Sequence, residues 1–150
     1  MSDAVDGDLL QRARDAASHG DLPQAFDLFV EADADRPLGL PDLAILGDIA
    51  YLAGHLDVTI ETWERAYAGF LRTGDPVAAA GAAVRVAMHL LFDTALMAPV
   101  RGWLARAQQL LKDPGETAAH AWLAVVRTYE RMLTGDLPGA RPWALSLIHI

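Results

Sequence analysis

Large apolar residues recur at intervals of three and four along most of the chain. The spacing is clearest in Leu56, Ile60, Trp63, Tyr67 and Phe70. It returns in Val100, Leu104, Ala107 and Leu111, and in Trp122, Val125, Val126, Tyr129, Met132 and Leu133. Residues with this spacing share one face of an α-helix. The pattern therefore predicts an all-α chain in which each helix buries one apolar face.

Short segments that contain Gly, Asp or Pro separate these apolar stripes. They fall at residues 20–21, 35–41, 54–55, 74–76, 113–115 and 135–136. Such residues end helices or begin turns, and Gly7, Gly20 and Gly39 are interpreted as turn glycines. The sequence thus predicts eight helical segments, approximately 7–19, 22–35, 41–53, 56–73, 76–92, 96–112, 116–134 and 137 onward. Because every link is short, we expect neighbouring helices to form antiparallel hairpins.

The predicted hairpins share an internal repeat. A shift of 34 residues aligns Gly20 with Gly54. The same shift pairs Leu22 with Leu56, Phe26 with Ile60, Phe29 with Trp63, and Ala32 with Ala66. A segment that begins Gly20-Asp21-Leu22-Pro23 returns 115 residues later as Gly135-Asp136-Leu137-Pro138. If Ala95 occupies the turn of the intervening unit, the three steps are 34, 41 and 40 residues and together equal this offset.

Residues 39 to 72 resemble the tetratricopeptide repeat family, whose period is also about 34 residues. The matching positions are Leu46-Gly47, Gly54, Trp63 and Ala66. Gly47 and Ala66 allow two helices to approach closely, Gly54 permits a left-handed backbone, and Trp63 fills the space beside small neighbours. The resemblance implies a right-handed α-solenoid of antiparallel helix hairpins with about seven to eight helices.

The last six residues differ in character from the repeats. Leu145-Ser146-Leu147-Ile148-His149-Ile150 resembles a translated transposon end of the kind used as a sequencing adapter. We therefore expect a repeat domain over 1–144 that is incomplete at its C-terminus, followed by a non-native tail at 145–150. The alternative is a genuine short protein whose final segment pairs with a partner. An uncapped solenoid leaves an apolar face in water, so we expect self-association through residues 122 to 144.

The charge and the cysteine content narrow the classes of function. The formal net charge is −8 with a pI near 4.9, and there is no cysteine. Binding to nucleic acid or to an anionic membrane needs a basic surface, so neither partner is expected. The longest apolar stretch, from Pro76 to Phe92, contains Arg85 and His89 and is shorter than the ~20 residues that span a bilayer. These features favour a cytoplasmic protein without disulfides.

The sequence contains no recognisable catalytic or cofactor motif. Phosphate-binding glycine loops, the dinucleotide-binding fingerprint and the nucleophile elbow of serine hydrolases are all missing from the 150 residues. The five histidines show neither an HExxH pair nor a spacing with carboxylates that would assemble a zinc site. We therefore expect a protein that is not an enzyme and that has no metal or cofactor.

In the tetratricopeptide family, the first helix of each hairpin lines a concave surface that holds peptides or partner helices. Carrying these positions across predicts a binding groove at Arg14, Asp48, Tyr51, Arg85, His89, Phe92, Trp122 and Tyr129. This amphipathic set suits a protein or peptide partner, or a small effector. Helical spacing nevertheless favours core positions for Phe92, Trp122 and Tyr129, and a partly buried packing role for His89.

The stretch from Glu61 to Leu111 resembles the repeat regions of LuxR-type transcriptional regulators from high-GC bacteria. The resemblance rests on Thr62-Trp63-Glu64-Arg65-Ala66-Tyr67 and Gly102-Trp103-Leu104-Ala105-Arg106-Ala107. It implies a non-catalytic interaction or effector-sensing region whose DNA-binding helix-turn-helix is missing from this fragment. Two alternatives stay open, namely the regulatory repeat arm of a nucleotide cyclase and a free-standing tetratricopeptide adaptor.

Overall fold

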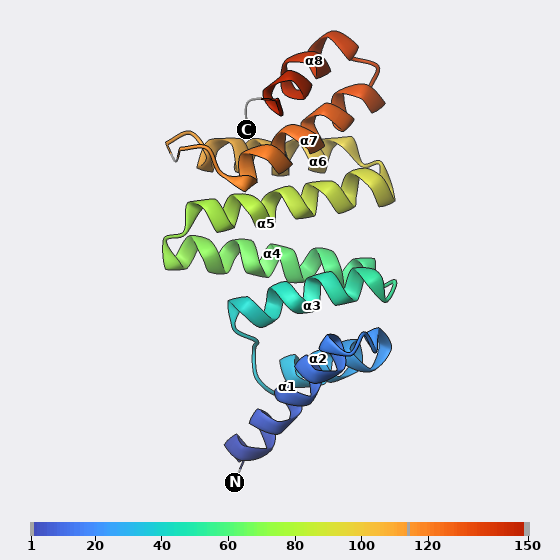
Figure 1. The fold of residues 1–150 in the computed structure, drawn as a ribbon, viewed down its shortest axis with the longest axis vertical. Helices are drawn as coiled ribbons and strands as arrows, with labels where there is room; N and C mark the ends of the chain where they lie inside the picture. Colours follow the sequence, from blue (N-terminus) through green and yellow to red (C-terminus); the bar gives the residue numbers. More distant parts are fainter. Residues whose placement is uncertain (1, 114, 149–150) are drawn as a thin grey trace. The chain divides into compact units, whose positions relative to one another are not determined.

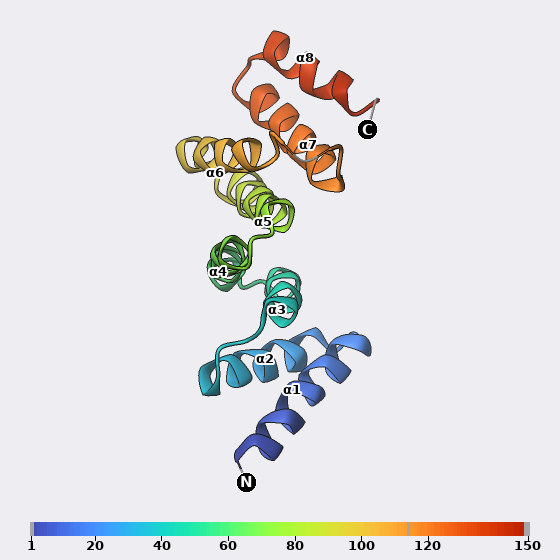
Figure 2. The same cartoon turned by 90° about the vertical axis from the view of Figure 1, so that its left-hand side faces the viewer.

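All regular structure in the described part of the chain is helical (Figures 1 and 2). The computed structural model describes residues 2–113 and 115–148, with side chains from Asp8 onward. The helices are α1 (Ser2–Ser18), α2 (Leu22–Asp35), α3 (Leu40–Leu52), α4 (Leu56–Thr73), α5 (Pro76–His89), the π-helical turn η1 (Leu90–Thr94), α6 (Met97–Leu110), α7 (Ala118–Leu133) and α8 (Leu137–Ser146). The all-α prediction is therefore confirmed, and the eight predicted segments correspond to the eight α-helices.

Apart from shifts of one or two residues at helix ends, the structure departs from the prediction in three places. Helix α1 begins at Ser2, so Gly7 lies inside a helix and its assignment to a turn is wrong. One glycine inside a helix costs only about 1 kcal/mol relative to alanine, so it does not have to end the helix. Helix α5 ends at His89, and its C-terminal continuation is the π-helical turn η1. At the other end of the chain, α8 includes Leu145 and Ser146 of the predicted tail, whereas 149–150 lie outside the described residues.

The turns of the four predicted repeat units share one backbone conformation. Gly20, Gly54 and Gly135 have φ values of +77°, +88° and +79°. Ala95 has φ +55° and ψ +24°, and it is the one non-glycine residue with positive φ in the described part of the chain. Ala95 thus lies in a left-handed turn between η1 and α6, at the position that the repeat interpretation gives it. A left-handed backbone is unfavourable for a residue with a Cβ, so this turn has a conformational cost that the glycine turns avoid.

The repeated Gly-Asp-Leu-Pro segment is a signal for a helix start. The Asp21 carboxylate accepts the backbone N–H of Gln24 at 3.3 Å, and the Asp136 carboxylate accepts that of Gly139 at 2.9 Å. A proline lies at the first or second position of each following helix, where its missing N–H is not needed. The glycine thus reverses the chain, the aspartate caps the next helix, and the proline fixes its first turn.

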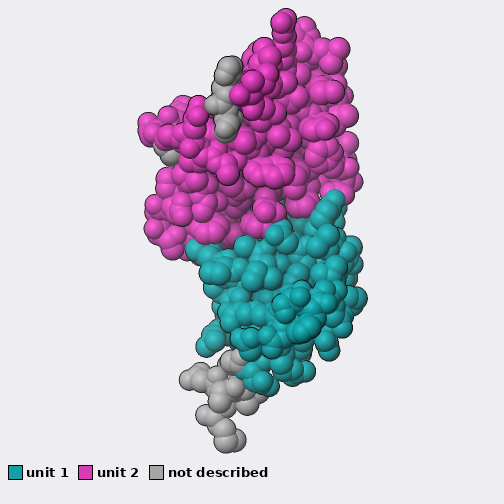
Figure 3. All heavy atoms as spheres, in the orientation of Figure 1, with its two compact units in different colours: residues 1–62 teal, residues 63–150 magenta. Residues whose placement is uncertain are grey.

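The chain divides into two compact units, residues 1–62 and 63–150, with the boundary inside α4 (Figure 3). In the first unit, α1 packs against α2, and α2 also contacts α3. Its core consists of Ala13, Ala16, Ala25, Leu28, Phe29, Leu46 and Ile49. The ring of His55 stacks on Phe26 with centroids 3.9 Å apart, which holds the turn between α3 and α4 against α2. Gly47, expected at a close helix contact, is buried here.

In the second unit, α5 contacts both α6 and α7, and α7 packs against α8 (Figure 2). The buried residues of α5 are mostly small and comprise Ala79, Ala80, Ala82, Ala83, Val84, Val86, Ala87 and His89. Small side chains let two neighbours approach one helix closely, which explains how α5 is covered on two sides. Trp63 is 5% exposed and Ala66 is fully buried, so the prediction that both lie at packed positions is confirmed.

One segment, Pro76–Thr94, is long and apolar enough by composition to cross a membrane. It comprises α5 and η1, and half of it is buried within the protein. Helices in the core of a folded domain meet the same criterion. The absence of a membrane contact therefore stays a prediction.

The predicted apolar stripe of α7 differs from the face that this helix buries. Trp122, Tyr129, Met132 and Leu133 are all exposed. The buried residues of α7 are Ala119, Leu123, Ala124, Val126, Arg127 and Glu130. The predicted stripe is therefore right for Val126, which is fully buried, and wrong for its exposed members, because the buried face also includes small residues and two charged ones.

Candidate functional site

Helices α5 and α7 of the second unit form a groove with a volume of about 240 Å3. The groove is lined by Gly81, Val84, Arg85, Met88, Ala118, Ala119 and Trp122. Two of the predicted groove residues, Arg85 and Trp122, therefore line one groove. The Trp122 side chain is 57% exposed although it borders an apolar surface. An exposed aromatic ring beside a largely apolar hollow can cover an apolar group of a ligand.

Two further predicted residues lie against each other. The rings of Phe92 in η1 and Tyr129 in α7 meet edge to face with centroids 5.3 Å apart. Both rings remain about half exposed, at 51% and 46%. The expectation that Phe92, Trp122 and Tyr129 belong to the core is therefore wrong. Helix α7 turns a different face toward its neighbours and leaves these aromatic rings at the surface.

Arg85 and His89 lie one helical turn apart on α5. The Arg85 guanidinium lies 4.5 Å from the centre of the Trp63 ring, within the range of a cation–π contact. His89 is 4% exposed, and its Nδ1 lies 3.8 Å from Oδ2 of Asp93. The packing role expected for His89 is confirmed. Arg85 instead combines a place in the groove lining with a contact to a buried tryptophan.

The other three predicted residues belong to the first unit. Arg14 donates two hydrogen bonds to Asp42, from Nε and Nη2, each 2.9 Å long. The hydrogen bond to Asp42 is the main cause that raises the pKa of Arg14 above its ordinary value. The Arg14 side chain therefore links α1 to α3. Asp48 and Tyr51 are exposed on α3.

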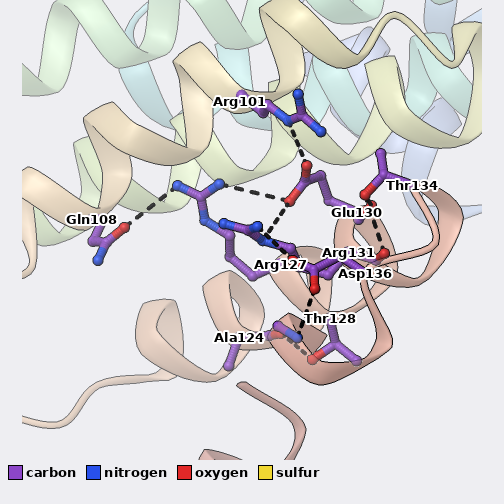
Figure 4. A network of polar contacts seen from close by, with 10 residues as sticks. Arg101, Gln108, Ala124, Arg127, Thr128, Glu130, Arg131, Thr134 and Asp136 are labelled. Carbon is purple, nitrogen blue, oxygen red and sulfur yellow. Dashed lines mark hydrogen bonds and ion pairs between the residues drawn. The ribbon is translucent and has the colours of Figure 1, made fainter. Parts of the chain in front are cut away.

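A buried carboxylate in the second unit is not among the residues that the sequence predicts for a site (Figure 4). Glu130 of α7 is fully buried, and its Oε1 accepts a 2.7 Å hydrogen bond from Nε of Arg101 in α6. Its Oε2 lies 3.9 Å from Nη1 of Arg127 and 3.4 Å from Nε of Arg131. Arg131 also pairs with Asp136 at 2.7 Å, at the start of α8. The network therefore links α6, α7 and the α8 cap.

A signal for this network exists in the sequence. Glu130 follows Leu123 and Val126 at intervals of seven and four, so it falls on the stripe that α7 buries. A charged residue on an apolar stripe needs partners of opposite charge, and Arg127 and Arg131 lie within one turn of it. The contact to Arg101 spans 29 residues of sequence and could not be predicted without knowing how α6 and α7 pack.

No three His, Asp or Glu side chains come together to hold a metal ion within residues 8–113 and 115–148. The groove offers apolar contact area and the guanidinium of Arg85. Comparison of the chain with protein-family models and with curated proteins finds no match.

Proposed function

We propose that the chain is a right-handed solenoid of antiparallel, tetratricopeptide-like helix hairpins that binds a protein or peptide segment, or a small effector, without catalysis. The main observation in support of this proposal is the groove between α5 and α7. Both helices are first helices of their hairpins under the repeat assignment, and Arg85 and Trp122 line the groove together. The hairpin assignment rests on the sequence repeat, because the left-handed turns at Gly54, Ala95 and Gly135 have the same backbone conformation as Gly74 between two hairpins.

The dimensions and lining of the groove favour a small apolar group as the part of the ligand that enters it. About 240 Å3 is less than the ~300–1,000 Å3 typical of sites for whole small molecules. It suits one or two side chains of a longer segment that continues along the exposed rings of Phe92 and Tyr129. Gly81, Ala118 and Ala119 leave the space open because they carry no side chain or a single methyl group.

Filling the groove tests this function. A Cβ added at Gly81 meets no atom within 4 Å, so Gly81→Leu places a side chain in the groove without a clash at Cβ. Gly102→Leu in α6 is the matched control, because Gly102 is exposed and also has open space around an added Cβ. Peptides selected from a displayed random 12-residue library against the wild-type chain should bind Gly81→Leu at least tenfold more weakly. Equal affinity for both variants, or no enrichment, would contradict the proposal.

We further propose, from the resemblance of residues 61 to 111, that this region belongs to a LuxR-type transcriptional regulator and receives its signal. The coding sequence beyond residue 144 tests this part separately. A helix-turn-helix there supports the regulator. A cyclase domain there would instead support the regulatory arm of a nucleotide cyclase. A stop after a polar capping helix would support the free-standing adaptor.

A further inference from the structure

The Arg127 guanidinium in α7 is buried with too few acceptors. Its side chain is 10% exposed, and its Nε has no hydrogen-bond partner among the described residues. Nη1 is 3.9 Å from Oε2 of Glu130, which is beyond hydrogen-bond distance. Nη2 donates to Oε1 of Gln108 across 3.4 Å, a long and weak hydrogen bond. The neighbouring side chains therefore satisfy this cation incompletely.

The surrounding charges leave one positive charge in excess. The network holds three guanidiniums, from Arg101, Arg127 and Arg131, against the two carboxylates of Glu130 and Asp136. Arg101 bonds to Glu130, and Arg131 bonds to Asp136. Desolvation is the largest influence on Arg127 and lowers its pKa from the ordinary value, yet a guanidinium keeps its proton at any physiological pH. The excess charge therefore belongs to Arg127, in a chain whose net charge is −8.

An external acceptor can reach Arg127 from the side of Gln108. Gln108 is exposed on α6, and Figure 4 shows Arg127 lying between it and Glu130. Arg101 lies seven residues before Gln108, so both are on the same face of α6, and the Arg101 side chain is 55% exposed. On the α8 side, the Trp143 ring lies 5.9 Å from Cζ of Arg127. The weak bond to Gln108 is thus the one that an incoming group would replace.

We propose that Arg127, with Arg101 and Gln108 beside it, forms a binding site for a single carboxylate. A carboxylate matches the planar fork of a guanidinium, and its one negative charge balances the excess of the network. The source is the side chain or C-terminus of a partner polypeptide, or a small organic acid. This site uses α6, α7 and α8 and does not depend on the groove between α5 and α7.

The first test supplies the carboxylate from the chain itself. In Gln108→Glu, the new carboxylate takes the place of the amide oxygen that already faces Arg127. We expect the melting temperature to rise by about 2–4 °C. Gln109→Glu is the matched control, because Gln109 is the exposed neighbour that has no bond to Arg127, and it should leave the melting temperature unchanged. A melting temperature of Gln108→Glu at or below that of Gln109→Glu would overturn the proposal.

The second test adds the carboxylate from solution. Sodium acetate is titrated into the full chain at constant ionic strength while the Trp143 indole N–H is followed by NMR. The shift should saturate in the wild type and require at least tenfold more acetate in Arg127→Gln and in Gln108→Glu. Arg106→Gln, which removes a guanidinium that stacks on Trp103 instead, should behave like the wild type.

The anion and its source are distinguished in the same assay. N-acetylglutamic acid α-amide presents a side-chain carboxylate, and N-acetylglycylglycine presents a C-terminal carboxylate. Saturation by either compound supports the site, and the compound that binds more tightly shows whether a side-chain or a C-terminal carboxylate is preferred. Saturation by acetate alone indicates that the ligand is a small organic acid. Equal responses to acetate and chloride, or tighter binding of inorganic phosphate than of acetate, would show that the cluster is not a carboxylate site.

Discussion

Arg101 on the surface of α6 donates a 2.7 Å hydrogen bond to Glu130, which is fully buried on α7. The pair therefore joins a half-exposed cation to an anion that has no access to water. Removing Glu130 would leave the nearby Arg127 buried without a carboxylate. Breaking a buried ion pair from one side typically costs about 3–5 kcal/mol, and we expect this loss in the free energy of unfolding for Glu130→Ala.

Urea denaturation followed by circular dichroism measures the effect of Glu130→Ala. The matched control is Glu116→Ala, because Glu116 is exposed and makes no ion pair with the network. The control should change the free energy of unfolding by less than about 0.5 kcal/mol. A loss below ~1 kcal/mol in Glu130→Ala would mean that the network does not stabilise the packing of α6 and α7.

Replacing Ala95 by glycine should remove the conformational cost of its left-handed turn and so stabilise the fold. A Cβ in this conformation costs about 1–2 kcal/mol, whereas glycine costs about 0.5–1 kcal/mol in additional chain entropy. We therefore expect Ala95→Gly to raise the free energy of unfolding by about 0.5–1 kcal/mol. The reciprocal change, Gly135→Ala at φ +79°, should lower it by a similar amount. Thermal melts of both variants check the pair, and a loss of stability in Ala95→Gly would contradict the turn assignment.

The sequence predicted the helices well because their boundaries are local. The Gly20-Asp21 and Gly135-Asp136 pairs each combine a left-handed turn with a helix cap, and both devices act within a few residues. The sequence shows that the step from Gly54 to Ala95 is 41 residues instead of 34, but it does not show the structural cause of the extra residues. The π-helical turn from Leu90 to Thr94 leaves no mark in hydrophobic periodicity, since the same residues could continue an α-helix.

The candidate sites were predicted less completely because they depend on which face each helix turns inward. The large apolar residues of α7 selected the side that carries Trp122 and Tyr129, yet the helix buries Glu130 instead. Hydrophobic periodicity selects the helix face that carries the large apolar residues. Packing against α5 and α8 also buries small residues and charged residues that are paired. Arg85 and Trp122 were nevertheless predicted on one surface, and they line one groove.

Trp63 should be important for stability. It is 5% exposed in α4, and its ring contacts the Arg85 guanidinium. Replacing a buried tryptophan by alanine typically costs about 3–5 kcal/mol, through lost burial and the cavity left behind. We expect this loss in the free energy of unfolding for Trp63→Ala. Trp122→Ala, at a 57% exposed tryptophan, is the control and should cost less than ~1 kcal/mol in the same denaturant melts. Equal losses would refute the packed position of Trp63.

The α8 cap should make stability depend on acidic pH. The pKa of Asp136 lies below its ordinary value, mainly because the carboxylate accepts the Gly139 N–H and also a hydrogen bond from Arg131. A carboxyl with a lower pKa in the folded state stabilises the fold above its unfolded pKa of about 3.9, and this stabilisation is lost as the pH falls through the folded pKa.

Asp136→Asn tests the charge at this cap while an amide oxygen can still accept the Gly139 N–H. The wild type should be more stable than Asp136→Asn at pH 6–7, and the difference should shrink steadily below about pH 4. Urea midpoints measured between pH 3 and pH 7 give this comparison. A difference that stays constant across the range would show that the ionised carboxylate contributes nothing to the folded state.

We also expect the exposed apolar surface of α7 and α8 to associate with a second copy of the chain. Leu133 and Leu137 are 58% and 64% exposed, and Tyr129 and Met132 are close to them in sequence and about half exposed. An apolar surface of this kind loses contact with water when two copies pair, which is favourable in proportion to the area buried.

Sedimentation equilibrium should show an average molecular mass that rises with protein concentration. Leu133→Lys should reduce this rise, whereas Leu52→Lys, at an equally exposed leucine of α3, should not. A wild-type chain that stays strictly monomeric at about 1 mM, where even a weak complex worth ~4 kcal/mol would form, disproves the association.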